Sequence, residues 1–302
     1  MNGFSYEKAF AASQRINWAI EDIIGEDKPL DFAKPFLPEA LARTDGMIFL
    51  SPAERVVLNQ IRGHNYLAIF GLVEEFILPF VLDHARPHLS GDDARVRALL
   101  QFAGEEAKHI DLFKRFRTAF TKGFGVPCDA IGPADAVAKA VLAHHPLAVA
   151  LVILHIEWMT QRHFLDSVKD DRAIDPQFKS LLKHHWMEEC QHAQLDTLMV
   201  HAIADACDAE EIGRGIDGYL ALGGMIDGAL KQQVAFDLAA FEKACARTLD
   251  ADERAAFVEH QTKAMRWTFL GSGMTHPNFT ATLGQLSPAA RERIAGIAPA
   301  FC

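Results

Sequence analysis

Several features that assign a protein to a class are missing from this 302-residue sequence. It has no CxxC pair, and its five cysteines, an odd number, do not form a recognisable disulfide framework. No basic run interrupts a formal net charge of -10, which argues against nucleic acid or an anionic membrane as a partner. The sequence therefore indicates reduced thiols and a cytoplasmic location, with the acidic charge serving solubility.

Long apolar segments and targeting segments are also scarce. The first ten residues lack the charged-then-apolar pattern of a signal peptide. The longest apolar run, 146–156, is too short to span a bilayer and is typical of a buried helix. No segment alternates apolar and polar residues with a period of two, so we expect an all-α fold.

Helical periodicity, proline and capping residues divide the chain into elements. Ser51-Pro52 with Glu54, and Asp175-Pro176, have the form of helix N-caps with proline at the first helical position. We expect irregular chain at 28–38 and a loop at 271–279. Helices are predicted at 4–24, 52–82, 93–120, 134–144, 146–168, 176–207, 209–248, 251–268 and 288–295.

The order of these elements predicts one helical domain, 1–302. Within it, 51–207 holds four long helices with a long link between the second and third, which matches a four-helix bundle with one crossover. Residues 1–50 supply an extra helix and a connection, and 208–302 supply additional helices that cover the bundle.

Two segments have the form Glu-x-x-His, namely Glu106/His109 and Glu189/His192. Residues three apart on a helix lie on the same face, so the two side chains of each pair can bind one metal ion. With 18 glutamates and 14 histidines in the chain, such pairs also arise by chance, and the motif alone is weak.

The spacing of a third and fourth glutamate is more specific. Glu74 and Glu157 each lie inside an apolar helical segment, and each precedes its Glu-x-x-His pair by 32 residues. Two such half-units supply four carboxylates and two imidazoles, the ligand set of a dinuclear carboxylate site. Each carboxylate lies in an apolar stripe, where an unpaired charge costs several kcal/mol, so a pair of cations is the natural partner.

Some positions stay open on the residues alone. Glu75 is an alternative to Glu74, although the bulkier apolar face and the repeated spacing favour Glu74. Glu105 and Glu188, next to the two motifs, are expected to face solvent.

His185 and Asp196 lie on the same stripe as Glu189 and His192. His185 is either a third imidazole ligand or a packing residue at the bundle end. Asp196 is either the acceptor for the second N–H of a metal-bound histidine or a polar surface residue.

These residues resemble the ferritin-like di-iron carboxylate superfamily over about 55–205. The segment HHWMEECQHAQLD, with His185-x-x-x-Glu189-x-x-His192, is similar to the arylamine N-oxygenases such as p-aminobenzoate N-oxygenase. That resemblance implies a non-haem di-iron centre that activates O2 after reduction. It implies the ligands Glu74, Glu106, His109, Glu157, His185, Glu189 and His192.

The leading hypothesis is thus an O2-dependent oxidoreductase, such as an N-oxygenase of an aromatic amine or a similar small organic substrate, with an external electron donor. The metals are two iron ions, with manganese or a mixed Mn/Fe pair as alternatives that ligand type does not separate. The alternative function is a ferritin-like ferroxidase or metal-handling protein, against which the roughly one hundred residues after the bundle argue. Those residues suit a substrate pocket or a homodimer surface.

Overall fold

The computed structural model describes residues 3–302, and within that range it contains helices and no strand beyond an isolated bridge between Gly25 and Lys28. The all-α prediction is therefore confirmed. The helices that form the bundle and position the site are α4 (Pro52–Ala85), α5 (Asp93–Phe124), α7 (Pro146–His163) and α8 (Pro176–Ala204).

The remaining elements flank these four. At the amino-terminal side lie α1 (Tyr6–Ser13), α2 (Ile20–Ile23) and α3 (Glu39–Ala42), with η1 (Arg86–His88) and α6 (Ala134–Leu142) between bundle helices. The carboxyl-terminal part comprises α9 (Ala209–Ala244), α10 (Ala251–Arg266), α11 (Ser272–Met274), α12 (Pro277–Leu286), α13 (Pro288–Ile297) and η4 (Ala298–Phe301). Two π-helical turns, η2 (Phe164–Val168) and η3 (Trp267–Gly271), extend α7 and α10.

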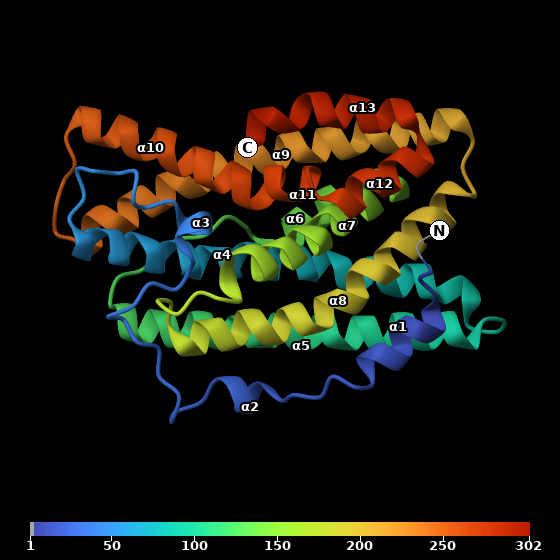
Figure 1. The fold of residues 1–302 in the computed structure, drawn as a ribbon, viewed down its shortest axis with the longest axis horizontal. Helices are drawn as coiled ribbons and strands as arrows, with labels where there is room; N and C mark the ends of the chain where they lie inside the picture. The colour runs from blue at the N-terminus through green and yellow to red at the C-terminus, as the bar shows by residue number, and fades with distance from the viewer. Residues whose placement is uncertain (1–2) are drawn as a thin grey trace.

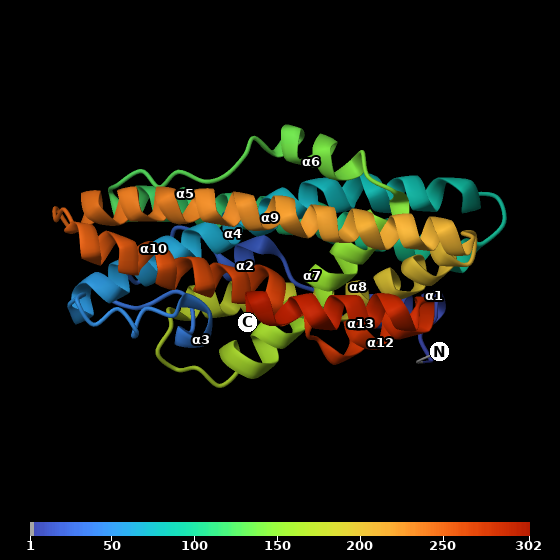
Figure 2. The same cartoon turned by 90° about the horizontal axis from the view of Figure 1, so that it is seen from above.

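The bundle is covered on two sides. In Figure 1, α9, α10 and α13 lie along one side of it, and α2 lies on the opposite side. Viewed from above, α9 runs the length of the molecule and α6 lies outside it (Figure 2). α9 packs against α4 and α7, whereas α1 packs against α5 and α8. The bundle helices are therefore enclosed, which explains why α7 is buried on nearly every face.

The start of α4 follows the capping prediction. Ser51 Oγ accepts a hydrogen bond from the Glu54 backbone N–H, and the Ser51 backbone N–H donates to Glu54 Oε2, with Pro52 at the first helical position. Such a cap contributes about 1 kcal/mol. It sets where the first ligand-bearing helix begins.

The predicted helix at 4–24 is wrong, because the chain is helical only in α1 and α2 and extended between them. The extended stretch carries Trp18 into the interior, where its ring stacks on His109 at 6.1 Å between centroids. Burial of an aromatic side chain outweighs the modest helix propensity of the segment.

The predicted loop at 271–279 is also wrong. Pro277 opens α12, with His276 Nδ1 accepting the Asn278 N–H at 3.3 Å as a cap. Gly273 does not mark a turn here. A Cβ at Gly273 would lie 2.3 Å from His155 Cδ2, so the glycine permits close approach of two helices.

One segment, Pro52–His88, is long and apolar enough to cross a membrane by length and composition alone. In the structure 56% of its most apolar window is buried within the protein. The buried core helix of a soluble bundle meets the same criteria, so this segment is weak support for a membrane location.

Candidate metal centre

The bundle brings two overlapping clusters of metal-ligating side chains together. One consists of Glu74, His109, His185 and Glu189. The other consists of Glu106, His109, Glu189 and His192. Within each cluster the ligand atoms lie within 4.8 Å of one another, and every member is buried. These residues form a buried carboxylate and histidine cluster that can bind two metal ions.

Glu189 on α8 is central to both clusters. Its Oε1 lies 3.2 Å from His109 Nδ1 and 2.8 Å from His185 Nε2. Its Oε2 lies 3.4 Å from His192 Nδ1. The two oxygens thus face different histidines, which is the arrangement a bridging carboxylate needs.

The remaining predicted ligands lie around this carboxylate. Glu74 Oε1 is 3.1 Å from His185 Nε2, and Glu106 Oε1 is 3.0 Å from His192 Nδ1. Glu157 on α7 is buried but lies in neither four-residue cluster, and burial together with the nearby Glu189 carboxylate raises its pKa well above the ordinary value.

Glu74 rather than Glu75 points into the centre. The Glu74 side chain is 3% exposed, whereas Glu75 is 34% exposed and pairs with Lys114 at 3.4 Å. We expect Glu74→Ala to lower metal content by at least one ion per chain. Glu75→Ala, one position along the same helix, should leave it at two. Elemental analysis of both variants tests this, and equal losses would contradict the choice.

Glu105 and Glu188 were expected to face solvent, and this is wrong. Both are buried, and each binds the histidine of the opposite motif. His109 Nε2–H donates to Glu188 Oε2 at 2.8 Å, and His192 Nε2–H donates to Glu105 Oε2 at 2.8 Å. These bonds fix the protonated nitrogen of each ring, so Nδ1 is left to face the metal position.

Asp196 does not take that role. It is buried, but the second nitrogen of His192 is occupied by Glu105. Within residues 3–302 neither Asp196 carboxylate oxygen has a hydrogen-bond partner. Burial, together with the negative charge of Glu106, raises the pKa of Asp196 well above its ordinary value.

Glu188 is held from its outer side as well. Lys108 Nζ donates to its other oxygen, and the same ammonium lies 3.7 Å from the centroid of the Trp18 ring. Nothing in the sequence singled out Lys108 or Trp18. The repetition of Glu-Glu-x-x-His, with a doubled glutamate in both motifs, was the available signal for Glu105 and Glu188.

We expect Glu188→Gln to weaken metal binding about 10- to 100-fold while the two-ion stoichiometry at saturation persists. The amide cannot stabilise the His109 N–H as the carboxylate does. Metal titration with a competing chelator measures the affinity. Glu188 would have no positioning role if the titration curve were unchanged.

Several ligand atoms that face the centre have no hydrogen-bond partner, which indicates that the centre binds cations. Among the described residues, Glu74 Oε2, both Glu106 oxygens, His109 Nδ1, Glu189 Oε1 and His192 Nδ1 are buried without a hydrogen bond. Buried polar atoms are normally paired, but most atoms that face this centre are not, the exception being the pair His185 Nε2 and Glu74 Oε1 at 3.1 Å. Hard carboxylate oxygens with imidazole nitrogens fit iron or manganese.

The pKa shifts of the metal-free centre agree with this. Burial, reinforced by the charges of Glu106 and Glu189, raises the pKa of Glu74 well above its ordinary value. Burial alone lowers the pKa of His109, but its hydrogen bond to Glu188 and the adjacent Glu189 carboxylate outweigh burial and raise the pKa to about 9. Protons thus take the place of metal charge in the metal-free protein.

Solved structures resemble this chain in fold, at low sequence identity. No family model matches the sequence, and no curated protein matches it. An R2-like ligand-binding oxidase with aerobically reconstituted Mn/Fe cofactor aligns with 87% of this chain and 92% of its own, at 16% identity and a TM-score of 0.48. A point mutant of an R2-like ligand-binding oxidase with an Fe/Fe cofactor aligns with 88% and 93%, also at 16% identity and a TM-score of 0.48.

Proposed function

We propose that this protein is a dimetal, O2-dependent oxidoreductase that acts on a small organic molecule. The observation that carries the proposal is the pair of buried clusters that share His109 and Glu189. Most ligand atoms that face the centre are unpaired, whereas the outer nitrogens of His109 and His192 are paired. Two iron ions, or one iron and one manganese ion, held by these residues would pass electrons from the substrate and an external donor to O2.

The protein's own residues orient the histidine ligands and shield the centre from water. Glu105 and Glu188 hold the two histidine rings in one tautomer and orientation. The aromatic rings of Phe102 and Phe113 cover His192 and His185 at centroid distances of 4.0 and 5.0 Å. Water is thereby kept from the centre, which strengthens electrostatic interactions inside it.

The finer assignment, N-oxygenation of an aromatic amine by a cytoplasmic enzyme with an external electron donor, remains part of the proposal. His185 supports it, because its Nε2 lies within 3.1 Å of Glu74 and 2.8 Å of Glu189. A third imidazole in the ligand set is the feature that resembles the arylamine N-oxygenases.

Anaerobic loading with Fe(II), alone or with Mn(II), followed by elemental analysis and oxygen-electrode measurements, tests the function. We expect two metal ions per chain, and O2 uptake on addition of a reductant and aniline, with an oxygenated product in the mass spectrum. Protein that binds no metal, or that binds metal without consuming O2, contradicts the proposal. Many irons per chain in a large assembly would indicate the ferroxidase alternative.

A further inference from the structure

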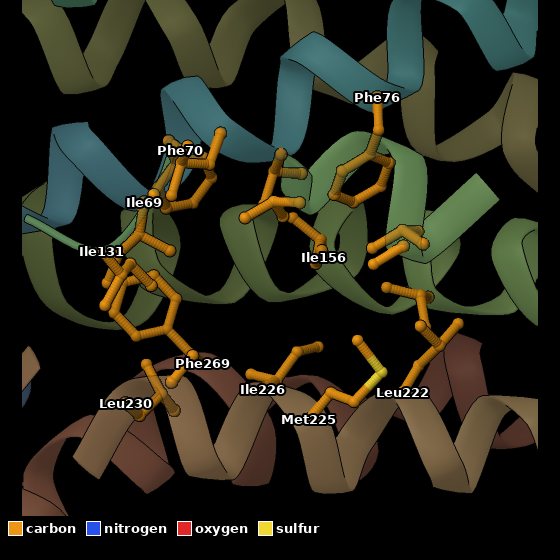
Figure 3. Close-up of a pocket in the computed structure, with 18 of the residues that line it drawn as sticks. Ile69, Phe70, Phe76, Ile131, Ile156, Leu222, Met225, Ile226, Leu230 and Phe269 are labelled. Atoms are coloured by element: carbon orange, nitrogen blue, oxygen red, sulfur yellow. The ribbon is translucent and has the colours of Figure 1, made fainter. Parts of the chain in front are cut away.

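An apolar cavity of about 320 Å³ lies between α4, α6, α7 and α9. Phe70, Phe269 and Ile131 gather at one end of it, and Phe76 and Leu222 lie at the other (Figure 3). Gln232 is the sole side chain with a polar group among those that line it in the described chain. The cavity is within the size range of small-molecule sites.

The cavity is separated from the metal centre by one side chain. Phe70 lines the cavity, and its ring also lies edge-on to His185 at 5.4 Å between centroids. Phe269, from the π-helical turn η3, packs against Phe70 at 6.1 Å. A molecule in the cavity can therefore contact Phe70, whose ring packs against the candidate ligand His185.

The size of the cavity limits what it holds. A closed apolar cavity of about 150 Å³ accommodates a benzene molecule. The volume here, about 320 Å³, is roughly twice that figure and corresponds to one or two aromatic rings.

The lining also limits the charge of the occupant. No Lys, Arg, Asp, Glu or His side chain lines the cavity within the described residues. A carboxylate placed there would lose its hydration without a counter-charge, at a cost of several kcal/mol. Met225 and Gln232 on α9 and Ala136 on α6 line the cavity yet are exposed, so it opens between α6 and α9.

A second cavity, of about 450 Å³, is lined in part by charged side chains. It lies between α4, α5 and the chain at 128–134, and Glu75, Lys114, Arg117 and Asp129 line it. The two cavities share Leu72, Ile131 and Gly132. A carboxylated ligand finds cationic partners in that cavity and none in the apolar one.

We propose that the apolar cavity is the substrate site and that it selects an uncharged aromatic molecule of one or two rings over a carboxylated one. This rests on the proposed function, and it narrows the substrate class from aromatic amines in general to those without an anionic substituent. Phe70 is the wall between the bound ring and the metal centre.

Two fluorescent probes that share a ring skeleton test the selection in metal-free protein. 1-Naphthylamine has two fused rings and is uncharged at neutral pH, and 4-amino-1-naphthalenesulfonate carries an added sulfonate. We expect the uncharged probe to bind once per chain and at least tenfold more tightly than the sulfonate. Equal or tighter binding of the sulfonate overturns the proposal and indicates the charged cavity or a general apolar surface.

A matched pair of variants on α9 locates the probe. Ala229 lines the cavity, so Ala229→Trp fills it, whereas Ala221 is exposed outside it and Ala221→Trp does not. We expect the first to weaken binding of the uncharged probe at least tenfold and the second to leave it unchanged. Ala140→Trp, from α6 on the opposite wall, repeats the test if Ala229→Trp does not fold. Unchanged binding in a folded cavity-filled variant overturns the proposal.

The two proposals fail in different ways. If metal loading or O2 uptake is absent while the uncharged probe still binds the cavity, the proposed function is wrong. If metal content is two and O2 uptake is normal while Ala229→Trp leaves the KM for aniline unchanged, the substrate site is wrong. A tenfold or greater rise in that KM with metal content still at two is the expected result.

Discussion

Replacing Glu189 by alanine is expected to remove both metal ions rather than one. Glu189 is the residue whose two oxygens face histidines in both clusters, with Oε1 at 2.8 Å from His185 and Oε2 at 3.4 Å from His192. Without it, no carboxylate links the two halves of the site. Metal content in Glu189→Ala should fall from two ions per chain to near zero in elemental analysis after equilibration with Fe(II) or Mn(II).

Replacing a ligand that belongs to only one cluster should have a smaller effect on metal content than replacing Glu189. Glu106 lies only in the cluster with His192, so Glu106→Ala should keep one ion. Loss of Glu189 also leaves buried imidazoles without a partner, which can destabilise the fold by about 3–5 kcal/mol. Glu189→Gln keeps the volume while removing the charge, and it should lose the metals in a folded protein. Two ions retained in that variant would contradict the bridging role.

The second large effect is the stabilisation of the protein by its metals. An ion present at 1,000 times its dissociation constant stabilises the folded state by about 4 kcal/mol, so two ions contribute about 8 kcal/mol. For a chain of this size that corresponds to a rise in Tm of about 15 °C. Differential scanning calorimetry with and without Mn(II) measures it, with Mg(II) as the control cation. A rise equal to that produced by Mg(II) would contradict a specific site.

The stabilisation should grow as the pH rises. In the metal-free protein the pKa of His109 is raised to about 9, so its contribution to stability is complete below about pH 6.5 and is lost as the pH approaches 9. The raised pKa values of Glu74 and Glu157 act in the same direction, because these carboxyl groups favour the folded state only while protonated. Metal ions replace these protons, so the gap in Tm between loaded and metal-free protein should widen from pH 6 to 8.5. A constant gap would show that the ions bind elsewhere.

The four central helices and the positions of the candidate ligands could be predicted, because both depend on local pattern. Helical faces follow from a fixed period, so Glu106 and His109 must point the same way wherever α5 lies. The 32-residue interval repeated in both halves then indicated which glutamates belong together.

Long-range contacts decided the parts that the sequence left open. Glu105 and Glu188 are charged and lie beside the motif on each helix, so their local pattern favoured exposure. They are buried because α5 and α8 pack together, which lets each bind the histidine of the other helix. The same packing separates Glu74 from its neighbour Glu75, one in the centre and one beside Lys114.

The sequence by itself determined an all-α chain with two Glu-x-x-His half-units on apolar helix faces, because those depend on residues a few positions apart. Only the tertiary structure decided that Glu189 joins two clusters and that an apolar cavity lies behind Phe70. The walls of that cavity come from α4, α6, α7, α9 and Phe269, segments separated by up to two hundred residues. Sequence periodicity does not predict which of these segments lie side by side, because their contacts depend on how the helices pack rather than on where each helix begins and ends.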